Sequence, residues 1–258
     1  MKLFYGLLLL CSGWVYAEDS TLSNQSATNI FLSSVSDRFR SAVGVYAPPD
    51  DYRDWALCEA KESILSVNSE KREELFVFVD RNPKKQLAML GFVTEDGSVL
   101  ALGWDFISTG DPKHGRDYHY TPCGIFLNSP NNFSYRAQGT KNERGWRGYG
   151  SKGKRIWDFG WQWSTKPIRG RDEPREIRLL MHATDPDYGE SKLGSVQSKG
   201  CVRVSAKFNI FVDELGALDR LYVERLTEAK FKAIVSKQYV PHGFEGRFLL
   251  VADSSDVF

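Results

Sequence analysis

The stretch that decides the fold is residues 75–107, which read LFVFVDRNPKKQLAMLGFVTEDGSVLALGWDFI. It holds three apolar runs, at residues 75–79, 87–93 and 99–107, and an Asp96-Gly97 turn separates the last two. Short runs rich in β-branched and aromatic residues, bounded by turn residues, are typical of strands. We therefore expect a meander of short strands at the centre of a mainly β fold.

The flanking sequence adds strands and a few helices. Apolar residues at helical spacing before Pro48-Pro49 predict a helical prefix over residues 18–72. Further strands are predicted at Gly124–Leu127, Ile156–Trp163, Ile177–Met181 and Phe248–Ala252. One helix is expected after Ser205, and a C-terminal helix over residues 219–237.

The N-terminus predicts export. Lys2 precedes an apolar run over residues 3–16, and Val15-Tyr16-Ala17 is followed by two acidic residues. This layout is that of a secretory signal peptide comprising residues 1–17, and the run is shorter than the roughly 20 residues that span a bilayer. No later segment is apolar enough to span, so we expect a secreted or periplasmic protein without stable membrane insertion.

Composition excludes two other classes. Hydrophobic residues make up 41% of the chain, which is too apolar for a disordered protein. The 34 basic residues nearly balance the 33 acidic ones, so the chain lacks the excess of positive charge that nucleic-acid binding uses. A globular protein without a nucleic-acid partner is expected.

The chemistry is concentrated between residues 180 and 205. His182 lies at the end of a predicted strand, and Ser198-Lys199-Gly200-Cys201-Val202-Arg203 follows after a loop. A nucleophilic thiol needs a base, and His182 is the candidate base for Cys201. Gly200 would let a substrate approach the amides near Cys201, and Arg203 would hold a carboxylate or brace the loop. From these residues alone, a buried structural cysteine is the alternative.

Two ordered motifs add a family resemblance. His182, a gap of 15 residues and Ser198-Lys-Gly-Cys-Val-Arg203 resemble the signature of the YkuD-type L,D-transpeptidases. An earlier block, Ser108-Thr-Gly110 with Thr121-Pro-Cys-Gly-Ile-Phe126, resembles that family's "STG…TPxGxF" stretch. The resemblance covers about residues 75–219, within a predicted catalytic domain over residues 73–253.

The resemblance implies a fold and an activity. It implies a β-sandwich-like catalytic domain in which Cys201 is the nucleophile and His182 is a base oriented by a backbone carbonyl. The substrates would be peptidoglycan stem peptides: the thiol would displace the terminal D-alanine of a tetrapeptide, and an amine would resolve the thioester into a 3-3 crosslink. Substrate or oxyanion contacts would come from Ser198, Lys199, Gly200 and Arg203. No metal or other cofactor is implied.

Two departures from the family pattern keep other functions open. Lys199 stands where the family usually has His, and Ala183 where Gly commonly follows the catalytic His. Water in place of an amine would make the protein an L,D-carboxypeptidase, and loss of the pocket geometry would leave a silent peptidoglycan-binding module.

The thiols outside the motif supply one more hypothesis. Cleavage after residue 17 leaves Cys58, Cys123 and Cys201, an odd number for an oxidising compartment. A Cys58–Cys123 disulfide would pin the prefix to the catalytic domain and leave Cys201 free, whereas two unpaired cysteines are the alternative.

Overall fold

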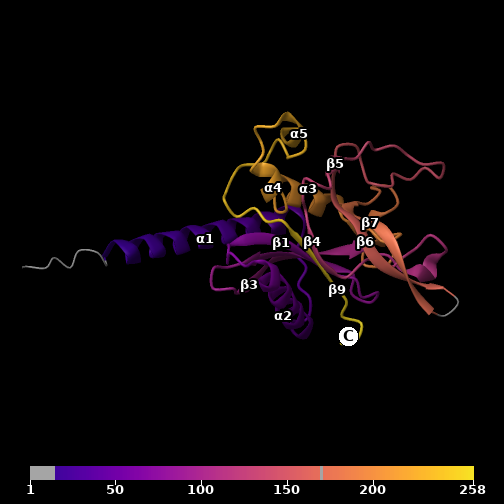
Figure 1. The fold of residues 1–258 in the computed structure, drawn as a ribbon, viewed down its shortest axis with the longest axis horizontal. Coiled ribbons are helices and arrows are strands. Elements are labelled where there is room, and N and C mark those ends of the chain that lie inside the picture. Colours follow the sequence, from indigo (N-terminus) through magenta and orange to yellow (C-terminus); the bar gives the residue numbers. More distant parts are fainter. Residues whose placement is uncertain (1–14, 169–170) are drawn as a thin grey trace, which may run out of the picture. The chain divides into compact units, whose positions relative to one another are not determined.

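Two long helices precede the strands, as the prefix predicts. The computed structural model describes residues 15–168 and 171–258, so residues 1–14 of the predicted signal peptide lie outside the described residues. The chain divides after Arg38 into two units, and each is described by itself. Helix α1 spans Val15–Ala42 and helix α2 spans Asp50–Val67, directly after the two prolines (Figure 1).

The second unit is built on one curled sheet of nine strands, which confirms the mainly β character. The strands are β1 (Glu74–Asp80), β2 (Leu87–Val93), β3 (Val99–Ser108), β4 (Gly124–Leu127), β5 (Tyr135–Arg136), β6 (Arg155–Ile168), β7 (Arg171–Ala183), β8 (Val202–Val204) and β9 (Phe248–Ala252). Their order is β4-β9-β1-β2-β3-β8-β7-β6-β5. The predicted strands are confirmed, and the short strands β5 and β8 are additional.

The central strands are apolar on both faces because both faces are covered. Every residue of β1 and β2 is buried. Helix α2 packs Tyr52 and Ile64 against Phe76 and Phe78 on one side. Helix α3 (Ala206–Leu215), confirmed after its N-cap Ser205, lies on the opposite side of this part of the sheet (Figure 1).

The predicted helix over residues 219–237 is wrong. The structure has two four-residue helices there, α4 (Arg220–Val223) and α5 (Ala229–Lys232), with turns between them. The backbone carbonyl of Ile234 accepts a hydrogen bond at 2.6 Å from the buried Arg155, which also pairs with Asp219 at 2.7 Å. These tertiary contacts replace the backbone hydrogen bonds that a continuous helix over residues 219–237 would form.

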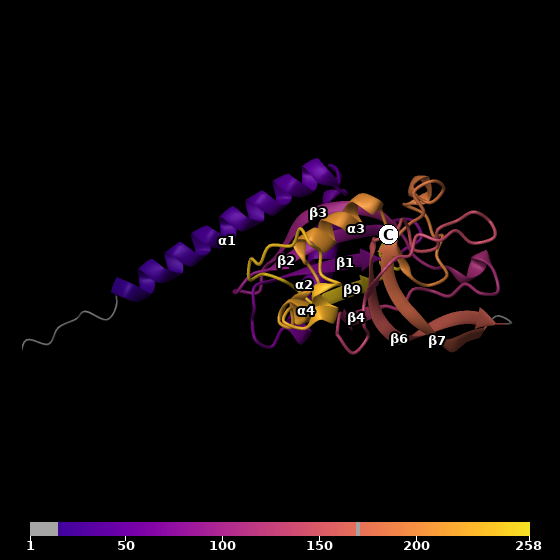
Figure 2. The same cartoon turned by 90° about the horizontal axis from the view of Figure 1, so that it is seen from above.

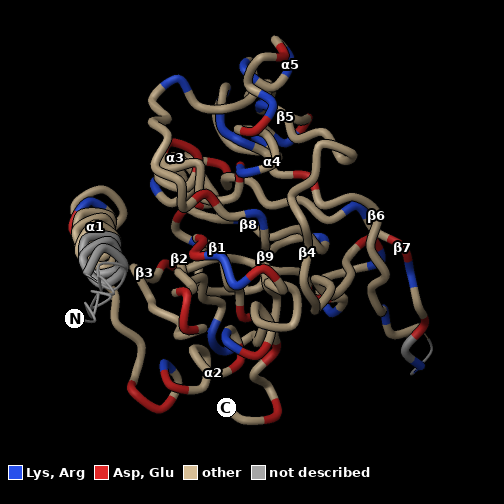
Figure 3. The backbone as a smooth tube through the Cα atoms, turned by 60° about the vertical axis from the view of Figure 1, so that its left-hand side comes forward, with Lys and Arg blue, Asp and Glu red and all other residues tan. Residues whose placement is uncertain are grey.

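Charged residues of both signs are interspersed along the described chain, as the neutral composition predicts (Figure 3). Among the described helices, none combines the length and the apolar character that crossing a membrane requires.

Candidate active site

The two motif blocks of the sequence meet at the end of β3. Ser108 of β3 pairs with Arg203 of β8, and Gly110 forms an isolated bridge with Ser198. The carbonyl oxygen of Thr109 accepts hydrogen bonds from the amides of Gln197 at 3.1 Å and Ser198 at 3.0 Å. The "STG" block, residues 108–110, therefore anchors the loop that carries Cys201 through backbone hydrogen bonds.

Two glycines make this contact possible. A Cβ on Gly110 would lie 2.5 Å from the backbone nitrogen of Gly200 and 2.2 Å from the carbonyl oxygen of His119. Gly200 has a backbone φ of +129°, which residues with a side chain rarely adopt. A Cβ at this position would also lie 2.6 Å from the Ile177 side chain. The backbones approach too closely for any larger residue.

Replacing Gly110 by alanine should therefore displace the nucleophile loop. Both obstructing atoms are backbone, so the loop must shift, and overpacking of this kind costs about 1–3 kcal/mol. We expect a lower melting temperature and slower alkylation of Cys201. Gly148→Ala is the matched control for stability, since a Cβ there meets nothing within 4 Å; equal melting temperatures for the two variants would contradict the close contact.

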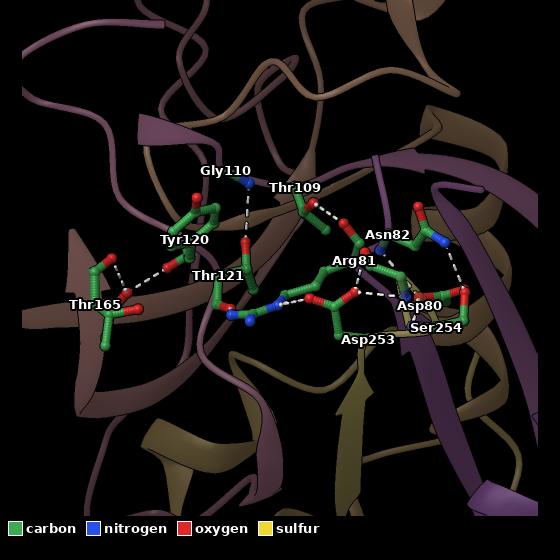
Figure 4. Close-up of polar contacts among 12 residues, drawn as sticks. Asp80, Arg81, Asn82, Thr109, Gly110, Tyr120, Thr121, Thr165, Asp253 and Ser254 are labelled. Carbon is green, nitrogen blue, oxygen red and sulfur yellow. Dashed lines mark hydrogen bonds and ion pairs between the residues drawn. The ribbon is translucent and has the colours of Figure 1, made fainter. Parts of the chain in front are cut away.

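A polar network that is buried at Gln86, Thr109 and Thr121 holds the "STG" block from the other side, with a partly exposed ion pair at its edge (Figure 4). The hydroxyl of Thr121 accepts from the amide of Gly110 at 2.9 Å, and Arg81 donates to the Thr121 carbonyl at 2.6 Å and pairs with Asp253. Gln86 donates to the Thr109 hydroxyl at 2.7 Å and accepts from the Thr109 amide at 2.6 Å. Satisfied buried networks of this kind restrict a loop to one position.

His182 is arranged as a neutral base. Its side chain is buried, and Nδ1 lies 2.8 Å from the carbonyl oxygen of Ala183. A carbonyl only accepts, so Nδ1 carries the proton and Nε2 keeps its lone pair. Burial, together with the charge of Arg203, lowers the pKa of His182 to about 4. The expected orientation by a backbone carbonyl is confirmed.

Cys201 is a protonated thiol at rest. Its side chain is partly exposed and packs against Ala137, Ile156 and Leu180. Sγ lies 3.9 Å from the carbonyl oxygen of Arg178. Burial raises the pKa of the Cys201 thiol, against the opposing effects of the Leu180 amide and the Arg203 charge. The pair therefore rests as thiol and neutral imidazole, so proton transfer belongs to the reaction step.

The topology brings the candidate residues Cys201 and His182 to neighbouring strands, with His182 in β7 and Cys201 directly before β8. In the parallel β7–β8 pair, Met181 lies opposite Val202 and His182 opposite Arg203, so Cys201 comes one residue before this pairing. No direct hydrogen bond joins Sγ and the imidazole in the described structure. Tyr149 lies beside His182: its ring meets that of His182 edge-on at 4.9 Å, and burial raises the pKa of its phenol.

Ser198 and Gly200 serve the shape of the loop. The Ser198 hydroxyl accepts from the Gly200 amide at 3.0 Å and donates to the carbonyl of Cys201. That amide is therefore engaged and does not point to a bound oxyanion. Lys199 is exposed and lies 3.7 Å from Asp117, so it is not adjacent to the thiol as a base.

Arg203, two residues along the chain from Cys201, lines a cationic cavity of about 790 Å³. The basic lining residues are Lys141, Arg144, Arg147, Lys192, Lys199 and Arg203, against two acidic ones, Glu143 and Asp185. Within the described part of the chain, the Arg203 guanidinium has no ion pair and no hydrogen bond to a backbone carbonyl. Burial lowers the pKa of Arg203. An unpaired guanidinium at a cavity wall favours carboxylate binding over loop bracing.

No family model matches the chain, and no curated protein matches it. Among the described residues, no group of three His, Cys, Asp or Glu side chains is arranged to hold a metal ion.

Two residues at the site were not predicted. Arg178 forms an ion pair with the buried Asp158 at 2.7 Å, and its carbonyl contacts Sγ. Alternate residues of a strand point to the same face, so the spacing of Arg178 and His182 in the sequence predicts that both lie on one face of that strand. Tyr149 comes from a distant loop, and no local signal in the sequence identifies it.

The predicted Cys58–Cys123 disulfide is wrong. Both are free and exposed. The thiol of Cys58 points along its own helix, with Sγ 4.0 Å from Glu62 Oε1. Glu62 lies one helical turn from Cys58, so the Cys58 thiol is held at the surface of its own helix and is not directed toward a disulfide partner.

Proposed function

We propose that this protein is a cysteine-dependent L,D-transpeptidase of peptidoglycan, with a YkuD-type catalytic domain, that acts in the periplasm or outside the cell. The observation that carries the proposal is a partly exposed thiol next to the strand pairing of a buried histidine whose Nδ1 donates to a backbone carbonyl. The histidine is thereby held as the tautomer that accepts a proton at Nε2. The packed motif blocks at Gly110 and Gly200 support the same reading.

The proposed reaction has two steps. Nε2 of His182 takes the proton of Cys201 as Sγ attacks the carbonyl carbon of the third stem residue. The bond to the terminal D-alanine then breaks, its nitrogen takes the proton from the imidazolium, and a thioester remains. The amine of a second stem attacks the thioester, the thiol is regenerated, and a 3-3 crosslink results.

The cationic cavity supports an anionic donor. A tetrapeptide stem carries a carboxylate on its terminal D-alanine and, in many walls, another on its diamino acid. Arg203 offers two parallel hydrogen bonds to one of these groups, and Lys192 and Lys199 add positive charge around it. The neutral form of the resting thiol avoids repulsion between a thiolate and the incoming carboxylates.

Mass spectrometry of a disaccharide-tetrapeptide reaction tests the proposal. Purified protein should convert the monomer into a crosslinked dimer with loss of one D-alanine, and Cys201→Ala protein should not. Tripeptide without dimer would make the protein a hydrolase instead. Unchanged substrate with a folded and alkylatable Cys201 would contradict both activities.

Replacing Arg203 by lysine should weaken donor capture. A point charge replaces the arginine fork, and hydrogen bonds to charged groups contribute about 1.5–3 kcal/mol, so we expect KM for the tetrapeptide to rise by roughly tenfold or more. The rate of Cys201 alkylation by iodoacetamide should stay unchanged. Arg225→Lys, outside the cavity, is the matched control. A joint fall in thiol reactivity and melting temperature would assign Arg203 to bracing the loop.

A further inference from the structure

Two tryptophans on the β6–β7 ribbon are left open to solvent. Trp161 is 60% exposed and Trp163 is 70% exposed. They are two residues apart in β6, so both side chains lie on one face. Neither indole has a ring, cation or hydrogen-bond contact with the residues that the structure describes. Large exposed apolar surface of this kind marks a binding site more often than a structural feature.

This face continues into the candidate active site. Across the ribbon, Trp161 lies opposite Arg178 and Trp163 opposite Glu176. The same face of β7 then passes through Leu180 to His182, and the carbonyl of Arg178 is 3.9 Å from Sγ of Cys201. The two indoles on β6 therefore begin two strands away from Cys201, with β7 between, and lead outward along the ribbon, which projects from the rest of the sheet (Figure 2).

We propose that Trp161 and Trp163 form a platform that binds the glycan strand of peptidoglycan while an attached stem peptide occupies Cys201. This inference rests on the proposed function. A sugar ring has an apolar C–H face and a rim of hydroxyl and amide groups. The flat indoles match the apolar face, and the exposed Arg178 and Glu176 beside them supply a donor and an acceptor for the rim.

The spacing fits this occupant. With the third stem residue at the thiol, two amino acids and a short acyl link separate it from the sugar, a reach of about 10 Å in extended form. Trp161 lies about 5 Å across the ribbon from Arg178, and Trp163 is about 7 Å further along. The tethered sugar therefore reaches the indoles without leaving the sheet face.

The charges on this face favour a glycan over a membrane surface. Anionic bilayers attract clusters of Lys and Arg. Here an acidic side chain, Glu176, stands beside the more exposed indole, and Arg178 is already paired with Asp158. A neutral sugar ring is compatible with one acidic and one basic side chain beside the indoles, whereas the Glu176 carboxylate would repel an anionic phospholipid surface.

Titration of full-length Cys201→Ala protein with chitohexaose, a soluble oligomer of N-acetylglucosamine, tests the platform without catalysis. Calorimetry should detect binding, and the double replacement Trp161→Ala with Trp163→Ala should raise Kd by at least tenfold. The double phenylalanine variant should recover most of the affinity because stacking is retained. Val240→Ala, another exposed apolar position, should leave Kd unchanged.

A kinetic comparison separates this inference from the proposed function. The alanine pair should lower kcat/KM for the disaccharide-tetrapeptide about tenfold and leave the sugar-free tetrapeptide unaffected. Undiminished chitohexaose binding by the alanine pair, or equal losses on both substrates, would overturn the platform. Binding to anionic phospholipid vesicles in its place would assign the face to a membrane. Chitohexaose binding by an enzymatically inert wild-type protein would retain the platform and contradict the proposed function alone.

Discussion

Cys201→Ala protein should form no crosslinked product and no covalent adduct with a carbapenem. The proposed reaction acylates Sγ of Cys201, so its removal leaves no route to the thioester. We expect the rate of product formation to fall on the order of 10⁴-fold or more. Intact-protein mass spectrometry after incubation with the β-lactam measures the adduct directly. The wild-type protein should gain the mass of one carbapenem molecule, because opening of the β-lactam ring releases no leaving group.

Two matched variants make this result specific. Cys58 and Cys123 are free thiols elsewhere in the structure, so Cys58→Ala and Cys123→Ala should keep both product and adduct. An adduct of full yield on Cys201→Ala protein would remove Cys201 from the mechanism. Loss of the adduct in either control would move the acylated thiol to that position.

His182→Ala protein should lose about a hundred- to ten-thousand-fold in kcat/KM, the usual contribution of a general base. The pH profile provides the sharper result. His182 has a pKa of about 4 in the folded chain, below its ordinary value, because burial disfavours the imidazolium. The base is therefore neutral and competent from neutral pH down to roughly pH 4, and activity should fall as pH drops through that value rather than near 6.5.

The same pKa sets the sign of a stability effect. Between about pH 6.5 and pH 4 the unfolded chain binds a proton at His182 that the folded chain does not, so the free energy of unfolding should decrease as pH falls through this window. His182→Ala should lose this dependence, and His114→Ala, which changes an exposed histidine, should keep it. An NMR titration of the His182 ring with a midpoint near 6.5 would contradict the lowering of its pKa by burial.

Part of the active-site arrangement follows from local sequence. Residues 75–79 and 87–93 are continuous apolar runs, and such runs become strands that are buried on both faces because periodicity and β propensity agree. His182 and Cys201 are the candidate base and nucleophile because of the motif that surrounds them in the sequence. Ser205 marked the start of α3 through its side chain, which accepts from the Phe208 amide.

Other features depend on residues far apart in the chain. The helix expected over residues 219–237 is interrupted because Arg155 takes a carbonyl that a longer helix would use. The sequence leaves two roles for Arg203, carboxylate binding and bracing of the loop. The unpaired guanidinium at a cavity wall favours carboxylate binding. Tyr149 reaches His182 from a loop that no local pattern connects to it.

The sequence by itself therefore determined the strand-rich class, the candidate pair His182 and Cys201, and the glycines of the loop between them. The tertiary structure alone decided the tautomer and charge state of His182, the free state of Cys58 and Cys123, and the exposure of Trp161 and Trp163. The physical reason is the range of the interactions. Side-chain periodicity and turn preference act over a few residues, whereas burial, desolvation and strand register are set by segments far apart in the chain, as where Val77 of β1 pairs with Leu249 of β9.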